Sequence, residues 1–121
     1  MATAPTKLIP EAPLAAAYHL LIDAEEVQIT RRALNSLIIE EAHEGQIRRH
    51  ARDVLARLLP DLRGKSMLSV PLTAEEMKIT HTALKLALDD SRREQQPERL
   101  LLRSVLDKLP DEHTIRAIRL V

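Results

Sequence analysis

The chain has 121 residues, of which 45% are apolar, and this suits one compact domain and excludes a wholly disordered protein. It carries 18 basic and 18 acidic residues and no cysteine, which argues against a strongly cationic nucleic-acid or membrane binder and excludes disulfides and thiolate sites. Tyr18 is the only aromatic residue, so the core must be aliphatic, as is typical of packed helices. A partner subunit would help so short a chain to bury enough surface.

The first residues predict an extended arm rather than a folded element. Pro5, Pro10 and Pro13 stand among small residues, and this pattern resists both helix and sheet over residues 1–13. Residues 1–9 lack the basic and apolar regions of a secretory signal, and no apolar run approaches the roughly 20 residues of a membrane span. We therefore expect a cytoplasmic protein that does not associate with a membrane.

The stretch from Asp23 to Asp61 recurs from Thr73 to Asp111, without a gap, at an offset of 50 residues. The residues that are identical in the two copies are, with the numbers of the first copy, Ala24, Glu25, Glu26, Ile29, Thr30, Ala33, Leu34, Glu44, Gln46, Arg49, Leu59, Pro60 and Asp61. Such self-similarity predicts a tandem duplication. We expect two repeats, residues 14–66 and 67–121, that share one core.

Alternating apolar residues predict a short strand before each copy. The alternating positions are Tyr18, Leu20 and Ile22, and their counterparts Leu68, Val70 and Leu72. They place strands at about 18–22 and 67–72, and Pro71 indicates that the second strand ends early or lies at a sheet edge. Residues 115–121 are either a third strand or a final helical turn after Asp111, because Ile115 and Ile118 are three residues apart.

Each copy opens with a signal for a long amphipathic helix. Asp23 is followed by Glu26, and Thr73 by Glu76, the pattern in which a side chain caps the first turn and a glutamate reaches back. Apolar residues then recur at spacings of three and four, which predicts helices that run to about residues 44 and 94. Gly45 is expected to cap the end of the first of them.

A second, shorter helix is predicted in each copy, at about residues 47–59 and 97–109. Pro97 suits the first turn of a helix, and both helices are expected to stop at a Leu-Pro-Asp sequence. The predicted fold is therefore mainly α: a tandem duplication of a helical hairpin with four main helices. Up to three short strands lie before, between and after the hairpins.

The sequence carries no recognisable catalytic, cofactor or metal motif. Glu40 and His43 are three apart on one helix face, beside Glu41 and Glu44, as in metal sites of helical bundles. That chemistry requires a second such pair, but the matching residues are Asp90 and Arg93, and an arginine does not ligate a metal. The chain has only two glycines and no nucleophile-elbow sequence, so we expect neither a phosphate-binding loop nor an enzyme.

Local charge raises the possibility of nucleic-acid binding. Residues 46–66 hold six basic and two acidic residues, whereas residues 1–45 hold three basic and seven acidic ones. Arg48, Arg49 and Arg52 are expected on the exposed side of the second helix, where a dimer could present them to DNA. The alternative is a solvated face with salt bridges. In the second copy Glu98 aligns with Arg48 and Asp107 with Arg57, which weakens the nucleic-acid hypothesis.

The hypothesis favoured by the sequence is a protein-protein interaction module that acts as a scaffold, adaptor or regulator. Amphipathic hairpins with balanced charge and no site residues suit a protein that offers a groove or a strand edge to an unidentified protein or to a second copy of itself. A homodimer is the simplest expected assembly. Tyr18, the one large amphipathic side chain, is expected at or near an interface.

Overall fold

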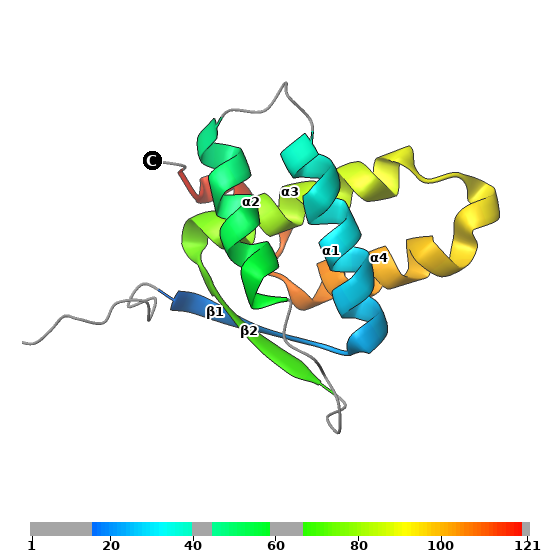
Figure 1. The fold of residues 1–121 in the computed structure, drawn as a ribbon, viewed down its shortest axis with the longest axis horizontal. Coiled ribbons are helices and arrows are strands. Elements are labelled where there is room, and N and C mark those ends of the chain that lie inside the picture. The colour runs from blue at the N-terminus through cyan, green and yellow to red at the C-terminus, as the bar shows by residue number, and fades with distance from the viewer. Residues whose placement is uncertain (1–15, 40–44, 59–66, 120–121) are drawn as a thin grey trace, which may run out of the picture.

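The computed structural model describes residues 16–39, 45–58 and 67–119. Its elements are, in order, β1 (Ala16–Ile22), α1 (Ala24–Ile39), α2 (Gly45–Arg57), β2 (Leu68–Thr73), α3 (Ala74–Asp90), the 3-10 turn η2 (Arg93–Gln95), α4 (Gln96–Lys108) and α5 (Glu112–Ala117), as Figure 1 shows. A strand, a long helix and a shorter helix thus follow one another twice. The predicted fold class, mainly α with short strands, is confirmed.

The two strands form an antiparallel ribbon along one side of the helices (Figure 1). Leu20 lies opposite Val70, and Ile22 lies opposite Leu68. Leu20, Ile22, Val70 and Leu72 are buried, which confirms the alternation that predicted both strands. Pro71 does not end β2; it lies in an edge strand, because both strands of a two-stranded ribbon have an open edge where a missing N–H costs nothing.

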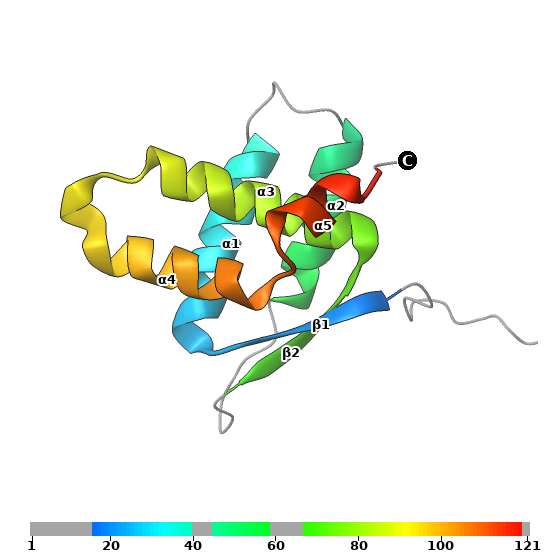
Figure 2. The same ribbon diagram turned by 180° about the vertical axis from the view of Figure 1, so that it is seen from behind.

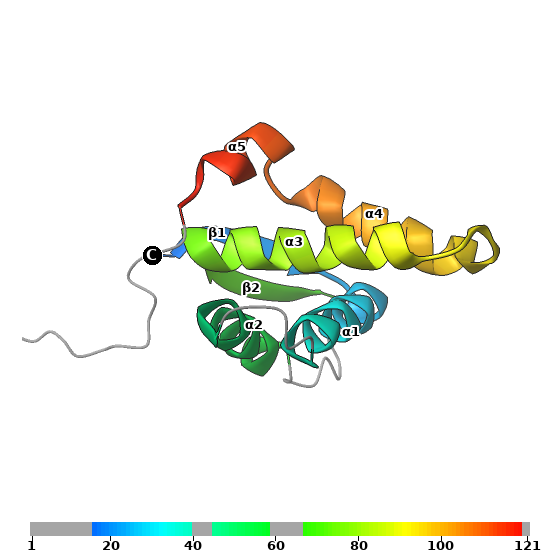
Figure 3. The ribbon, with the colours of Figure 1, turned by 90° about the horizontal axis from the view of Figure 1, so that it is seen from above.

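The four main helices form two crossed layers. Seen from above, α1 and α2 lie in one layer and α3 and α4 in the other (Figure 3), and the long helices α1 and α3 contact each other. The helix α5 packs on the outer side of α3, as the rear view shows (Figure 2). Each shorter helix also contacts the long helix of the other half, so neither hairpin packs independently.

A single aliphatic core joins the two halves. Val27 and Met77 are 4% and 6% exposed, and Leu34 and Leu84 are both fully buried. The corresponding residues of α1 and α3 are therefore buried to the same degree. The second half supplies the apolar surface that the first half would otherwise need from a partner chain.

The correspondence between the shorter helices differs from the gap-free sequence alignment. The helix α2 starts at Gly45 and α4 at Gln96, an offset of 51 residues. The buried residues follow the same offset: they are Ala51, Val54 and Leu58 in α2, and Leu102, Val105 and Leu109 in and after α4. Because one residue rotates an α-helix by about 100°, only this offset turns both apolar faces inward. The alignment without a gap is therefore wrong in the shorter helices.

The shift changes which charged residues correspond. Arg48 corresponds to Arg99 rather than to Glu98, and Arg57 corresponds to Lys108 rather than to Asp107. The argument that the second half replaces these arginines with acidic residues is thus wrong. The basic character at the end of α2 is kept at the end of α4.

Two helix boundaries differ from prediction, and the structure decides between the two alternatives for the last segment. The helix α3 ends at Asp90 instead of about residue 94, because both the backbone N–H and the hydroxyl of Ser91 bond to the Leu88 carbonyl. Gly45 begins α2 instead of capping α1, whose described part ends at Ile39. After Asp111, whose side chain accepts a bond from the Thr114 N–H, the chain forms helix α5. The third strand was therefore the wrong alternative and the helical turn the right one.

Candidate interaction groove and the ion pairs between the two halves

Two glutamates in equivalent places, Glu26 and Glu76, cap the long helices and are almost completely buried. Oε1 of Glu26 accepts a bond of 3.0 Å from the Asp23 N–H, and Oε1 of Glu76 accepts one of 2.9 Å from the Thr73 N–H. Both capping boxes that the sequence predicted are present. The two residues are only 2% and 3% exposed, and a buried carboxylate is costly unless it is paired.

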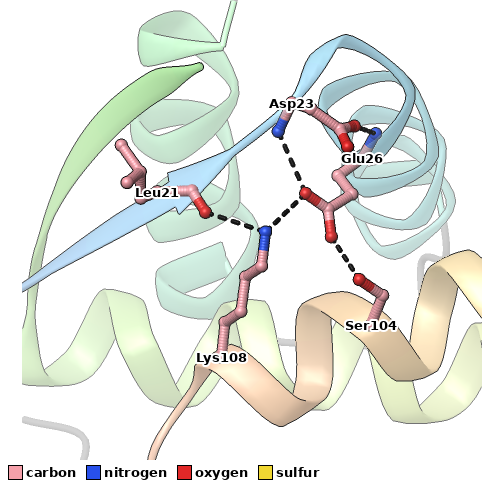
Figure 4. Close-up of polar contacts among 5 residues, drawn as sticks. All are labelled: Leu21, Asp23, Glu26, Ser104 and Lys108. Atoms are coloured by element: carbon pink, nitrogen blue, oxygen red, sulfur yellow. Dashed lines mark hydrogen bonds and ion pairs between the residues drawn. The ribbon is translucent and has the colours of Figure 1, made fainter. Parts of the chain in front are cut away.

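A cation from the opposite half pairs with each of these carboxylates. Nζ of Lys108 lies 2.6 Å from Oε1 of Glu26 and also donates to the Leu21 carbonyl (Figure 4). Nη1 of Arg57 lies 2.5 Å from Oε1 of Glu76 and also donates to the Pro71 carbonyl. Each shorter helix is thereby tied by its last residue to the strand and the long helix of the other half.

The two pairs differ in one further contact. The Ser104 hydroxyl donates to Oε2 of Glu26, so both oxygens of this carboxylate have donors (Figure 4). Burial raises the pKa of Glu26, but the hydrogen bonds from Lys108, Ser104 and Asp23 outweigh it, and the pKa lies below its ordinary value. At the place that corresponds to Ser104, the helix α2 carries Asp53, which is exposed.

Two adjoining hollows form a groove along α1. One, of about 240 Å³, lies between α1, α3 and the start of α4. The other, of about 350 Å³, lies between α1 and α4. The apolar residues that line the groove are Ala24, Ile29, Ala33, Leu37, Ala83, Leu86, Ala87, Leu101 and Leu102. We call this feature the α1–α4 groove.

An ion pair crosses the α1–α4 groove. Arg32 of α1 lies 3.0 Å from Glu98 of α4, and both residues line both hollows. The two side chains are 66% and 34% exposed, so the pair contributes less than about 1 kcal/mol and does not close the groove strongly. The groove has no signature in the sequence, because its walls come from three helices that are distant in the chain.

The three arginines of the predicted nucleic-acid face do not have equal exposure. Arg49 and Arg52 are exposed on α2, as predicted. Arg48 is half-buried, and its Nε is buried and has no hydrogen-bond partner among the described residues. Two of the three arginines are therefore exposed at the surface, and the third is half-buried.

Tyr18, the predicted interface residue, lies in β1 and is half-buried against the core. Its hydroxyl donates to the Lys108 carbonyl, so it links the ribbon to the end of α4 within the chain. The other sequence candidates, Glu40, Glu41, His43 and Glu44, lie outside the described residues.

No protein-family model, curated protein or solved structure matches this chain. Within residues 16–39, 45–58 and 67–119, none of the helices combines the length and the apolar character required to cross a bilayer.

Proposed function

We propose that the protein is a small helical protein-protein interaction module in which the α1–α4 groove receives an amphipathic helix. The helix belongs to a partner protein or to a second copy of the chain, which would make a homodimer. The observation that carries the proposal is an apolar-lined groove between α1, α3 and α4, which the Arg32–Glu98 pair crosses. Helices bind in such grooves through apolar residues spaced three, four and seven apart.

The dimensions of the groove support a helical ligand. Its lining runs along α1 from Ala24 to Leu37, which at about 1.5 Å per residue is roughly 20 Å, or between three and four helical turns. Its charged residues are Glu25, Arg32, Asp90 and Glu98, three acidic and one basic. This excess of negative charge favours a partner with lysine or arginine beside its apolar stripe.

Two exposed leucines provide a matched test. Leu86 lines the groove and is 43% exposed, whereas Leu100 of α4 is 63% exposed and does not line it. We expect Leu86→Glu to weaken association by about tenfold or more, as loss of an interface anchor does, and Leu100→Glu to leave it unchanged. Light scattering measures self-association against the 13.7 kDa mass of one chain, and a pull-down from the native host measures other partners. Equal behaviour of the two variants would contradict the proposal.

Nucleic-acid binding is a second candidate, because Arg49 and Arg52 are exposed on α2 and because an antiparallel two-stranded ribbon fits the DNA major groove. The outward side chains of the described ribbon argue against DNA binding, because His19, Leu21 and Ser69 carry no lysine or arginine charge for the phosphates. The neighbouring cations Arg57 and Lys108 are already paired with carboxylates.

The test of this second candidate is duplex DNA binding measured by fluorescence anisotropy at low and moderate salt. Binding that falls steeply with salt, and that is lost when Arg49 and Arg52 are changed to glutamine, would favour it. Absent or salt-insensitive binding would exclude it.

A further inference from the structure

Three potential metal ligands converge where α2 meets the start of α3. His50 and Asp53 lie three residues apart on α2, and Glu76 lies in the first turn of α3. One ligand atom from each lies within 4.8 Å of the others. His50 is half-buried, Asp53 is exposed and Glu76 is buried, so the cluster is at the surface but rests on a buried carboxylate.

The corresponding place in the other half shows what is unusual about this cluster. There, Leu101 and Ser104 of α4 stand where α2 has His50 and Asp53, and Glu26 stands where α3 has Glu76. The Ser104 hydroxyl donates to Oε2 of Glu26, and no second carboxylate is present among these three residues.

Glu76 receives no equivalent donor from the described residues. The bonds that they donate to its side chain, from Arg57 and from the Thr73 N–H, both end on Oε1. Asp53 is an acceptor at neutral pH and brings a second negative charge instead of a hydroxyl proton. The Glu76 side chain is thus only 5% exposed, and no described donor bonds to its second oxygen. A second carboxylate and an imidazole lie next to it.

We propose that His50, Asp53 and Glu76 bind a divalent transition-metal ion of the Zn²⁺ class. One imidazole nitrogen and two carboxylate oxygens suit Zn²⁺ and its neighbours, whereas Ca²⁺ and Mg²⁺ prefer oxygen ligands only. The ion would stabilise the buried Glu76 carboxylate, as the Ser104 hydroxyl stabilises that of Glu26. A fourth coordination position would remain open to solvent.

Charge and geometry are compatible with this assignment. With Arg57 paired to Glu76, the two carboxylates leave a net charge of minus one, which attracts a divalent cation. Bonds of about 2.0–2.2 Å in a tetrahedral zinc site place ligand atoms roughly 3.4 Å apart. The three ligand atoms, within 4.8 Å of one another, would need to approach by at most about 1.4 Å, and the Asp53 side chain is exposed.

The test is isothermal titration of the full chain, without affinity-tag histidines, with Zn²⁺ at neutral pH. We expect one ion per chain for the wild type. His50→Leu and Asp53→Ser copy the residues of the other half, and each should weaken binding by at least about tenfold. Because serine can donate to Glu76 as Ser104 does to Glu26, Asp53→Ser should keep the fold, which circular dichroism checks. Zn²⁺ should raise the melting temperature of the wild type and leave that of Asp53→Ser unchanged.

Two further variants make the outcome decisive. The double variant Leu101→His, Ser104→Asp builds the same ligand set beside Glu26, and its stoichiometry should rise from one to two ions per chain. His43→Ala should bind like the wild type. Absence of Zn²⁺ binding in the wild type, unchanged binding in both His50→Leu and Asp53→Ser, or loss of binding in His43→Ala would each overturn the proposal.

Discussion

Leu20 and Val70 lie directly opposite each other in the ribbon. They are equivalent residues, because Leu20 has the same place in the first half that Val70 has in the second half. Exchange of the two halves therefore maps this pair onto itself. The pairing of Ile22 with Leu68 becomes, under the same exchange, the pairing of Leu72 with Tyr18, which is also observed. The two halves are thus related by an approximate two-fold axis that passes between Leu20 and Val70, and the ion pairs of Glu26 and Glu76 follow it.

The symmetry of the core predicts equal costs for equivalent truncations. Leu34 and Leu84 are both fully buried, so Leu34→Ala and Leu84→Ala should each lower the free energy of unfolding by about 2–5 kcal/mol. Leu86→Ala, at a residue 43% exposed, should cost much less. Urea denaturation followed by circular dichroism measures all three and should show one transition. Two separate transitions in the wild type would contradict a shared core.

The pair between Lys108 and Glu26 should contribute more to stability than a surface pair does. Lys108→Met leaves the buried Glu26 carboxylate without its cation, and we expect a loss of about 1–3 kcal/mol in the free energy of unfolding at pH 7. The control is Arg116→Met, which removes a pair whose side chains are 70% and 50% exposed and should cost less than about 0.5 kcal/mol. Similar losses in the two variants would show that burial of Glu26 is unimportant.

Acid should destabilise the protein partly through Glu26. The pKa of Glu26 is lowered in the folded chain, since the hydrogen bonds from Lys108, Ser104 and Asp23 outweigh the effect of burial. A lowered folded pKa stabilises the protein fully above the ordinary value of 4.5, and this contribution is lost as the pH falls from there through the folded pKa. The difference in unfolding free energy between wild type and Glu26→Gln, measured in urea from pH 7 to pH 3, should therefore shrink below about pH 4.5. A difference that is constant with pH would refute this role.

Two buried hydroxyls offer a route to stabilisation. Oγ1 of Thr30 and Oγ1 of Thr80 are buried and have no hydrogen-bond partner among the described residues. Valine has the same shape without the unsatisfied polar atom, so Thr30→Val and Thr80→Val should each raise the free energy of unfolding by about 1 kcal/mol. Thr82→Val, at a partly exposed place on α3, should change it by less than about 0.5 kcal/mol. Destabilisation by both buried substitutions, seen in thermal denaturation, would mean that these hydroxyls are satisfied.

Features that depend on neighbouring residues could be predicted from the sequence. The alternation of Leu20 and Ile22 predicted β1, and the capping pairs Asp23–Glu26 and Thr73–Glu76 predicted where the long helices begin. Apolar spacings of three and four placed Leu34 and Leu84 on the inner faces of the long helices, and both are fully buried. These signals succeed because a cap or an apolar stripe is defined within a turn or two of the chain.

Features that depend on how the layers cross were decided by the tertiary structure. The offset of 51 residues in the shorter helices follows from which face each helix buries, and residue identity alone favoured 50. Lys108 and Glu26 are 82 residues apart in sequence, and the α1–α4 groove and the cluster of His50, Asp53 and Glu76 likewise join distant elements. Local patterns specify each helix and its buried face. Only the packing of one hairpin across the other determines which polar side chains meet.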